Sequence, residues 1–309
     1  MTRNSAGSSK GPEEEWSTLP KRDEKALAGL SDAGLPQGLD WIVPDGITSY
    51  SEMGSPTAQV HPYQFTTSMA ALAEEKGAKI ILGTVTAIDN TENRVKGVTY
   101  EDKASGKIRT LHATDVIIAA GPWSSRIFPG TPITAIRAHS VTIKADVSPY
   151  AIFTEISLPP SFGQAAATGS KAKRKRSKTV NPEMYARPNG EVYVCGEGDT
   201  RRALPKSADL VQVDDSRCAD LVAYVAHISD ALRDGEVLTR QACYLPSVGD
   251  GEGPLVGPTG VEGLLMATGH TCWGIQNSAA TGKLISEYLW EGKAKSAAVD
   301  SLDPRKWFS

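Results

Sequence analysis

Apolar residues first recur at helical spacing near residue 70. Phe65, Met69 and Leu72 fall on one face of a helix over residues 63–76, and Pro62 fits its first turn. Gly77 then supplies a terminator. The apolar run at 79–82 predicts a short buried strand. Helix, glycine and strand in that order are typical of one unit of a parallel α/β sheet.

Between residues 85 and 112 the pattern changes to short alternating segments. Turn residues at 89–90 and 105–106 separate them, which predicts an antiparallel meander with strands at 85–89, 95–101 and 107–112. The chain then enters a continuous apolar run at 115–121 that ends in glycine. A run of this kind is typical of a central parallel strand that is covered on both faces.

The second half of the chain combines further strands with two amphipathic helices. Strands are predicted at 140–145, 184–187, 191–195 and 263–268. Helices are predicted at 215–233 and 278–291, and Asn277 or Ser278 could cap the second one, which Gly292 closes. The whole pattern predicts an α/β protein.

Composition excludes several classes of protein. The 309 residues carry 33 basic against 36 acidic side chains, and this balance argues against a dedicated nucleic-acid-binding protein. No apolar run approaches the roughly 20 residues of a membrane span, and the amino end lacks the apolar segment of a secretory signal. We therefore expect a cytoplasmic protein with no integral membrane contact.

Metal chemistry is not predicted. The four cysteines include no CxxC pair, and the five histidines include no HExxH spacing. The densest charge block is KAKRKRSK at 171–178. It could be a nuclear-import tag or a patch for nucleic acid or acidic membrane, but a solvated insertion loop is the favoured interpretation because Gly, Ser and Ala surround it.

A glycine-containing loop near the carboxyl end carries the strongest chemical signal. The segment GHTCWGIQNSAATG at 269–282 joins a predicted buried strand to a predicted helix. A helix start presents unpaired backbone N–H groups and the positive end of the helix dipole, and can hold negative charge on a cofactor. An ordinary strand-to-helix turn is the alternative interpretation.

This loop, together with TDVIIAAGPW at 114–123, resembles the FAD-dependent D-amino-acid-oxidase-like family, which includes amino-acid, glycine and sarcosine oxidases. The CWGIQ sequence and the closing DPRK are similar to a fungal oxidoreductase branch that has been linked to endosomal traffic, which would imply a peripheral endosomal association. The resemblance implies a doubly wound FAD/NAD(P)-binding parallel sheet, incomplete at its amino end, interleaved with a mostly antiparallel substrate domain. It implies a polar amino terminus at 1–35, a substrate domain at 36–58 and 140–240, and a FAD-binding domain at 59–139 and 241–309.

The resemblance also implies the cofactor, FAD, and the residues near it. The backbone of Val85 would lie near the adenine. The pyrophosphate and flavin side would be lined by Ala120, Gly121 and Trp123. The pyrimidine edge of the flavin would be approached by Gly269, Trp273, Gly274 and Ile275.

The expected chemistry is oxidation of the C–N bond of an amine or an imino or amino acid. A hydride passes to the flavin, and oxygen or another acceptor then takes the electrons. No catalytic residue stands out. Tyr244 and Gln276 are candidate substrate-binding residues, and core packing is the equal alternative for Tyr244.

Two departures from the family pattern stand out. Leu245 occupies the position of the carboxylate-binding arginine of the amino-acid oxidases, and Gln276 that of the sarcosine-oxidase lysine, so a substitute would be Arg137, Arg187 or Arg240. The strand–GxGxxG–helix unit that holds the pyrophosphate is absent, and we expect that the first βαβ unit was lost. The alternative function is therefore a non-catalytic relative that acts as a binding or endosomal-trafficking protein.

Overall fold

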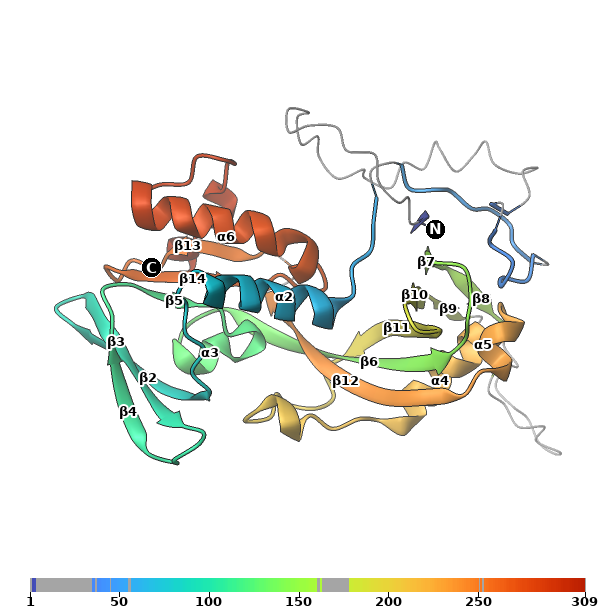
Figure 1. Cartoon of the computed structure of the whole chain (residues 1–309), viewed down its shortest axis with the longest axis horizontal. Helices are drawn as coiled ribbons and strands as arrows, with labels where there is room; N and C mark the ends of the chain where they lie inside the picture. The colour runs from blue at the N-terminus through green and yellow to red at the C-terminus, as the bar shows by residue number, and fades with distance from the viewer. Residues whose placement is uncertain are drawn as a thin grey trace. The chain divides into compact units, whose positions relative to one another are not determined.

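The computed structural model describes most of the chain: residues 2–3, 35–36, 38–44, 46–54, 57–159, 162, 178–249, 251 and 253–308. The basic run lies outside these residues except for Lys178, and so does nearly all of the predicted polar amino terminus. The described residues form an α/β protein with mixed sheets (Figure 1), as the sequence predicts.

The chain divides into two compact units. Unit 1 comprises Met1–His61, Ala138–Gly198 and Gln212–Ala242, and unit 2 comprises Pro62–Arg137, Asp199–Val211 and Cys243–Ser309. Residues 199–211 were predicted to lie in the substrate domain. They belong to unit 2, which contains most of the predicted FAD-binding domain. The strands β6 (Ile133–Lys144) and β12 (Val237–Val248) contribute residues to both units.

Unit 1 is built on an antiparallel sheet. The strand order is β1-β7-β10-β11-β6-β12, where β1 is Thr2–Arg3, β7 Tyr150–Phe153, β10 Glu183–Arg187 and β11 Glu191–Asp199. Asn189 and Gly190 turn β10 into β11 with φ of 72° and 68°, a left-handed pair suited to tight hairpins. A separate pair joins β8 (Ile156–Leu158) to β9 (Lys178–Val180).

Two helices form the core of unit 1 with alternate residues of this sheet. They are α4 (Asp215–Ala226) and α5 (Asp230–Asp234), and their Leu221, Val225 and Leu232 are buried with residues of β6, β10 and β11. The predicted single helix at 215–233 is wrong, because the hydroxyl of Ser229 accepts a hydrogen bond from the Leu232 N–H (3.3 Å) and begins a new helix.

Unit 2 contains two small sheets. In the first, β5 (Val116–Ile118) pairs in parallel with β14 (Leu264–Thr268), and β13 (Leu255–Pro258) pairs with β14 in the antiparallel direction. The helix α6 (Gly274–Glu291) lies over β13 and β14 (Figure 1). The short helical segments of this unit are η1 (Gly121–Trp123), α3 (Ser124–Ile127), η2 (Ala208–Leu210), η3 (Asp300–Leu302) and η4 (Pro304–Trp307).

The second sheet is the predicted antiparallel meander. Its strands are β2 (Gly83–Thr91), β3 (Arg94–Asp102) and β4 (Ile108–His112). The turn predicted at 89–90 is wrong, because the chain reverses at Glu92 and Asn93, whose φ values are 53° and 58°. A register irregularity at Asp89 and Asn90 lets β2 continue through the turn-forming residues.

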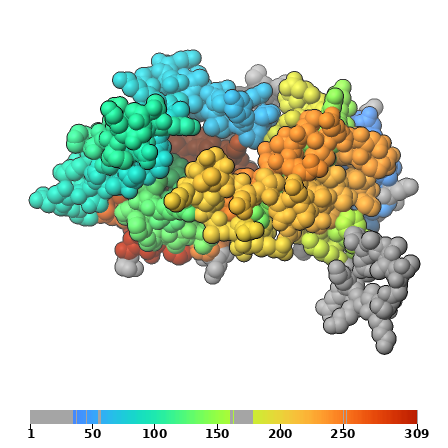
Figure 2. Space-filling model, turned by 90° about the horizontal axis from the view of Figure 1, so that it is seen from below, coloured from blue at the N-terminus to red at the C-terminus, as the bar shows by residue number. Residues whose placement is uncertain are grey.

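Part of the predicted parallel sheet is not enclosed. The strand predicted at 79–82 is absent, and Ile80, Ile81 and Leu82 are exposed. The predicted helix near residue 70 is confirmed as α2 (Pro62–Glu75), but none of its residues is buried, and Figure 2 shows this helix (light blue) at the surface. The strand β5, predicted to be central, lies at the edge of its sheet because no described strand pairs with its second side. These apolar surfaces have no cover within the described part of the chain.

Candidate functional site

The parallel pairing of β14 with β5 brings two loops to one edge of the sheet. Leu264 pairs with Val116 and Met266 with Ile118, so both strands end on the same side. Residues 119–123 follow β5, and residues 269–273 follow β14. The hydroxyl of Thr268 donates to the carbonyl of Gly121 (3.0 Å), which fixes one loop to the other. Ligands of open α/β sheets bind outside the carboxyl ends of parallel strands, and this edge is therefore the candidate site.

The first loop turns sharply at Gly121, whose φ is +52°. Open space surrounds its Cα, so a bound group could approach the backbone here, and Ala120 beside it is half-buried. Trp123 ends η1, and its indole N–H donates to the carbonyl of Pro205 (2.8 Å). The predicted cofactor-binding residues Ala120, Gly121 and Trp123 therefore lie together.

The second loop depends on a glycine. Gly269 has φ +84°, and a Cβ there would lie 2.4 Å from Cγ2 of Val248. Thr271 is also left-handed, with φ +51°, and its N–H donates to the carbonyl of Pro246 (2.9 Å). This hydrogen bond holds the loop against β12.

The loop ends at an uncapped helix start. The helix α6 begins at Gly274, four residues before the predicted start, because Trp273 rather than Asn277 or Ser278 is its N-cap. Trp273 makes no side-chain capping bond, and the first turn contains no acidic residue. The N–H groups of Gly274, Ile275 and Gln276 are therefore free of side-chain caps, and the positive end of the dipole is available to an anionic group.

The remaining predicted cofactor residue, Val85, lies on β2 and is 39% exposed. Trp273 is 54% exposed beside the start of α6, and Ile275 is half-buried in its first turn. The structure therefore places the predicted residues on three segments of unit 2.

His270 connects the second loop to α6. Its Nε2 lies 2.9 Å from the hydroxyl of Thr281, one of the residues in the third turn of the helix. Burial lowers the pKa of His270 below its ordinary value of 6.5, so the imidazole is neutral near pH 7. The neutral ring adds no charge next to the helix start.

The predicted substrate residues differ in their surroundings. Tyr244 is buried, and its hydroxyl donates to the carbonyls of Arg202 and Ala203 (3.1 Å each). Gln276 is exposed in the first turn of α6. Tyr244 thus holds a loop of its own unit, whereas the amide of Gln276 is open to a ligand.

Two of the three substitute arginines are engaged elsewhere. Arg137 forms a buried ion pair with Asp199 (3.2 Å). Arg187 pairs with Glu191 (3.4 Å), and its guanidinium stacks over the ring of Tyr193 at 4.3 Å from the centroid. Arg240 is exposed on β12.

Sequence reasoning missed the loop at 199–206. Its carbonyls at 202–205 accept hydrogen bonds from the side chains of Tyr244, Arg126 and Trp123. These donors come from two distant segments of unit 2, β12 and the adjoining η1 and α3, and they fix the loop beside η1. Backbone carbonyls are the same in every residue, so no sequence signal could have revealed them as acceptors.

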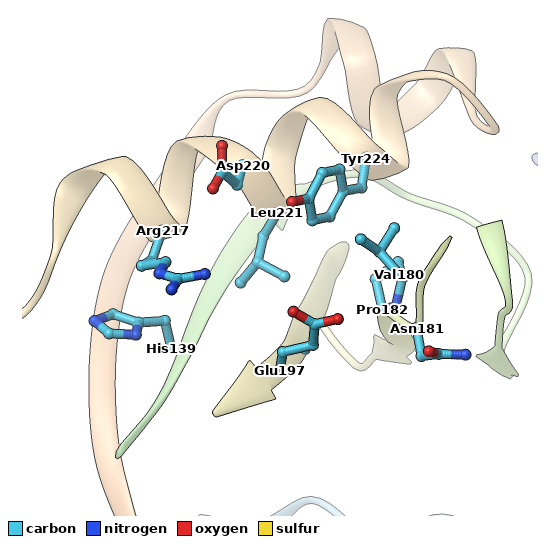
Figure 3. A pocket seen from close by; sticks show the side chains of 10 residues that line it. His139, Val180, Asn181, Pro182, Glu197, Arg217, Asp220, Leu221 and Tyr224 are labelled. Atoms are coloured by element: carbon cyan, nitrogen blue, oxygen red, sulfur yellow. The ribbon is translucent and has the colours of Figure 1, made fainter. Parts of the chain in front are cut away.

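Unit 1 has a separate cleft between α4 and the ends of β9 and β11 (Figure 3). Arg217, Asp220 and Tyr224 reach it from α4, and Glu197 from β11. The buried His139 accepts a hydrogen bond at Nε2 from the Asp214 N–H (3.0 Å). The cleft holds about 20 Å³, enough for one water-sized group and too little for an organic substrate.

Comparison with known proteins identifies the family. Residues 13–288 match the family described as FAD dependent oxidoreductase. The chain belongs to this family. It is 38% identical over 309 aligned residues to "Putative oxidoreductase TDA3" of Saccharomyces cerevisiae, and the match covers 89% of this chain and 56% of TDA3. The chain therefore spans little more than half the length of that relative.

Solved structures share the fold at low identity. Glycine oxidase from Bacillus cereus superposes with a TM-score of 0.57 at 19% identity, covering 76% of this chain and 57% of the oxidase. L-proline dehydrogenase from P. horikoshii superposes with a TM-score of 0.58 at 19% identity, covering 80% and 60% of the two chains. The predicted FAD-dependent oxidase fold and the oxidoreductase family are confirmed.

The two loops suit the negatively charged part of FAD, the cofactor that the family uses. The backbone at Gly121 is open, Gly269 lets the second loop pack closely against Val248, and the start of α6 presents uncapped N–H groups. None of the helices in the described part of the chain has the length and apolar character of a membrane span. Within the same residues, no group of three His, Cys, Asp or Glu side chains is arranged to hold a metal ion.

Replacing Gly269 by alanine should destabilise unit 2. Left-handed backbone costs an alanine about 1–2 kcal/mol, and the contact with Val248 adds to that cost. The matched control is Gly282→Ala within α6, where nothing lies within 4 Å and removal of a helical glycine should stabilise by about 0.5–1 kcal/mol. Urea unfolding measures both variants. Equal stability of the two would contradict the assigned role of Gly269.

His270 should make stability depend on pH. Because its folded-state pKa lies below 6.5, the unfolded chain takes up a proton that the folded chain does not as pH falls below that value. The free energy of unfolding should therefore fall between pH 7 and pH 5, and less steeply in His270→Gln, which retains a partner for Thr281. Urea midpoints at three pH values test this. Parallel pH profiles for the two proteins would show that His270 titrates normally.

Proposed function

We propose that this chain carries the flavin and substrate side of a FAD-dependent oxidoreductase that oxidises the C–N bond of an amine or an imino or amino acid. The supporting observation is the pair of glycine loops at the carboxyl ends of β5 and β14, next to the uncapped start of α6. The family match supports the cofactor. The names of the glycine and proline enzymes, which share the fold, support the substrate class.

The residues of unit 2 would hold the cofactor. Gly121 would let its atoms approach the backbone, Gly269 would let the second loop pack against Val248, and the N–H groups of Gly274, Ile275 and Gln276 would stabilise negative charge on it. The chemistry that FAD would supply when bound is acceptance of a hydride from the substrate and transfer of the electrons to oxygen or another acceptor. The neutral state of His270 leaves the helix dipole as the main positive feature at this position.

Substrate recognition would differ from that of the amino-acid oxidases. Leu245 carries no charge where a carboxylate-binding arginine would lie, and Gln276 offers an amide. Arg137 cannot leave its buried pair with Asp199 without stranding a carboxylate. We infer that an amine without a carboxylate is favoured over a free amino or imino acid, with Gln276 donating or accepting a neutral hydrogen bond.

The alternative is a non-catalytic binding or trafficking protein. It is favoured by three apolar surfaces that have no cover among the described residues: Ile80–Leu82, the helix α2 and the unpaired edge of β5. The two functions differ in whether the chain retains flavin.

Visible absorption of the purified chain, after FAD is added and excess removed, separates the two functions. We expect flavin colour at a ratio approaching one per chain. Gly274→Asp should lose most of it, because a carboxylate at the helix start repels the anionic cofactor, and only ordinary contacts surround the new side chain. Gly282→Asp adds the same charge further along α6 and should retain the colour. A colourless wild-type chain, or equal loss in both variants, would overturn the proposed function.

A further inference from the structure

Unit 2 has a pocket at the amino ends of β5 and β14, opposite to the candidate flavin loops. It measures about 290 Å³ and lies between the residues that precede β5 and β14, the last turn of α6 and the segment η4. The lining includes Asp115 before β5 and Gly263 before β14, whereas the candidate flavin loops follow these strands. The pocket is therefore separate from the site described above.

The walls of the pocket are apolar and polar in similar measure. Val261, Leu264, Leu265 and Leu289 line it together with the ring of Tyr288. The ring of Tyr288 packs against Gly257, where a Cβ would lie 3.3 Å from Cε2. Burial raises the pKa of Tyr288, so the hydroxyl remains protonated and the wall carries no phenolate. This surface suits the carbon chain of a small ligand.

The uncompensated charge in the pocket is negative. Arg305 is neutralised by Asp303, which accepts hydrogen bonds from its Nε (3.0 Å) and Nη2 (2.7 Å). Glu262 is paired with Arg94. Asp115 has no ion pair among the described residues, and its Oδ1 lies 3.6 Å from the position of a Cβ on Gly263.

The end of α6 adds to this negative character. The helix closes at Gly292, which has φ +75°, and its last turn contains no basic residue. The carbonyls of the last turn carry the negative end of the helix dipole. Asp115 and these carbonyls are complementary to a cation, and the ring of Tyr288 lines the same pocket.

We propose that this pocket binds an alkylammonium group, with the ammonium at Asp115 and the carbon chain against Tyr288 and Leu289. The volume suits a ligand the size of a short amine or a lysine side chain. Both sources present the same chemistry. The inference does not depend on flavin binding, because no residue of the candidate flavin loops lines the pocket.

Calorimetric titration of the 309-residue chain with n-butylammonium tests the proposal. We expect saturable binding that weakens with added salt, and no comparable binding of 1-butanol or butyrate. Asp115→Asn should weaken the affinity about tenfold, the usual value of a hydrogen bond to a charged group. Asp40→Asn, which removes an exposed carboxylate from unit 1, should leave the affinity unchanged.

A second variant and a second probe complete the test. Tyr288→Leu keeps an apolar wall but removes the ring, and should also weaken binding. N-acetyl-lysine methylamide distinguishes the sources: tighter binding than butylammonium indicates a protein lysine, and weaker binding a free amine. Unchanged affinity in Asp115→Asn, or butanol binding as tightly as the amine, would overturn the proposal. Repeating the titration with FAD present shows whether the affinity for butylammonium depends on flavin. A failure of this proposal is thereby distinguished from a failure of flavin binding.

Discussion

The parallel pairing of β14 with β5 is the constraint on which the candidate site depends. These two strands are short, yet their pairing places residues 119–123 and 269–276 at one edge of the sheet although about 150 residues separate them in sequence. The core around Ile118, Leu264 and Met266 stabilises the pairing through burial. Without it, Gly121, Gly269 and the start of α6 would not lie at the same edge of the sheet.

The opposite ends of the same strands have a different electrostatic character. At the carboxyl ends, the start of α6 supplies uncapped N–H groups, and the loop before it holds a neutral histidine, His270. At the amino ends, the end of α6 and Asp115 supply negative charge. One helix lying over β13 and β14 thus directs the positive end of its dipole to one edge of unit 2 and the negative end to the opposite edge.

Much of this arrangement could be predicted from the sequence, because it depends on local signals. The alternation at 85–112 predicted the meander, and Gly292 predicted the end of α6. The helix start could not be placed, because Asn277 and Ser278 are good caps in isolation, whereas the turn at Thr271 begins the helix earlier. The apolar run at 79–82 reads as a strand, but a strand needs a partner to pair with, and none lies beside it in the described residues. The hydrogen-bond acceptors for Tyr244 and Trp123 are backbone carbonyls. Every residue has one, so the sequence does not indicate which of them accept.

Hydrogen–deuterium exchange of the 309-residue chain, with and without FAD, tests the central claim most directly. If the loops after β5 and β14 hold the flavin, exchange should slow at residues 120–123 and at the first-turn amides of α6, Gly274 to Gln276, while unit 1 amides such as those of α4 stay unchanged. Unchanged exchange in both loops, or protection confined to other segments, would contradict the account.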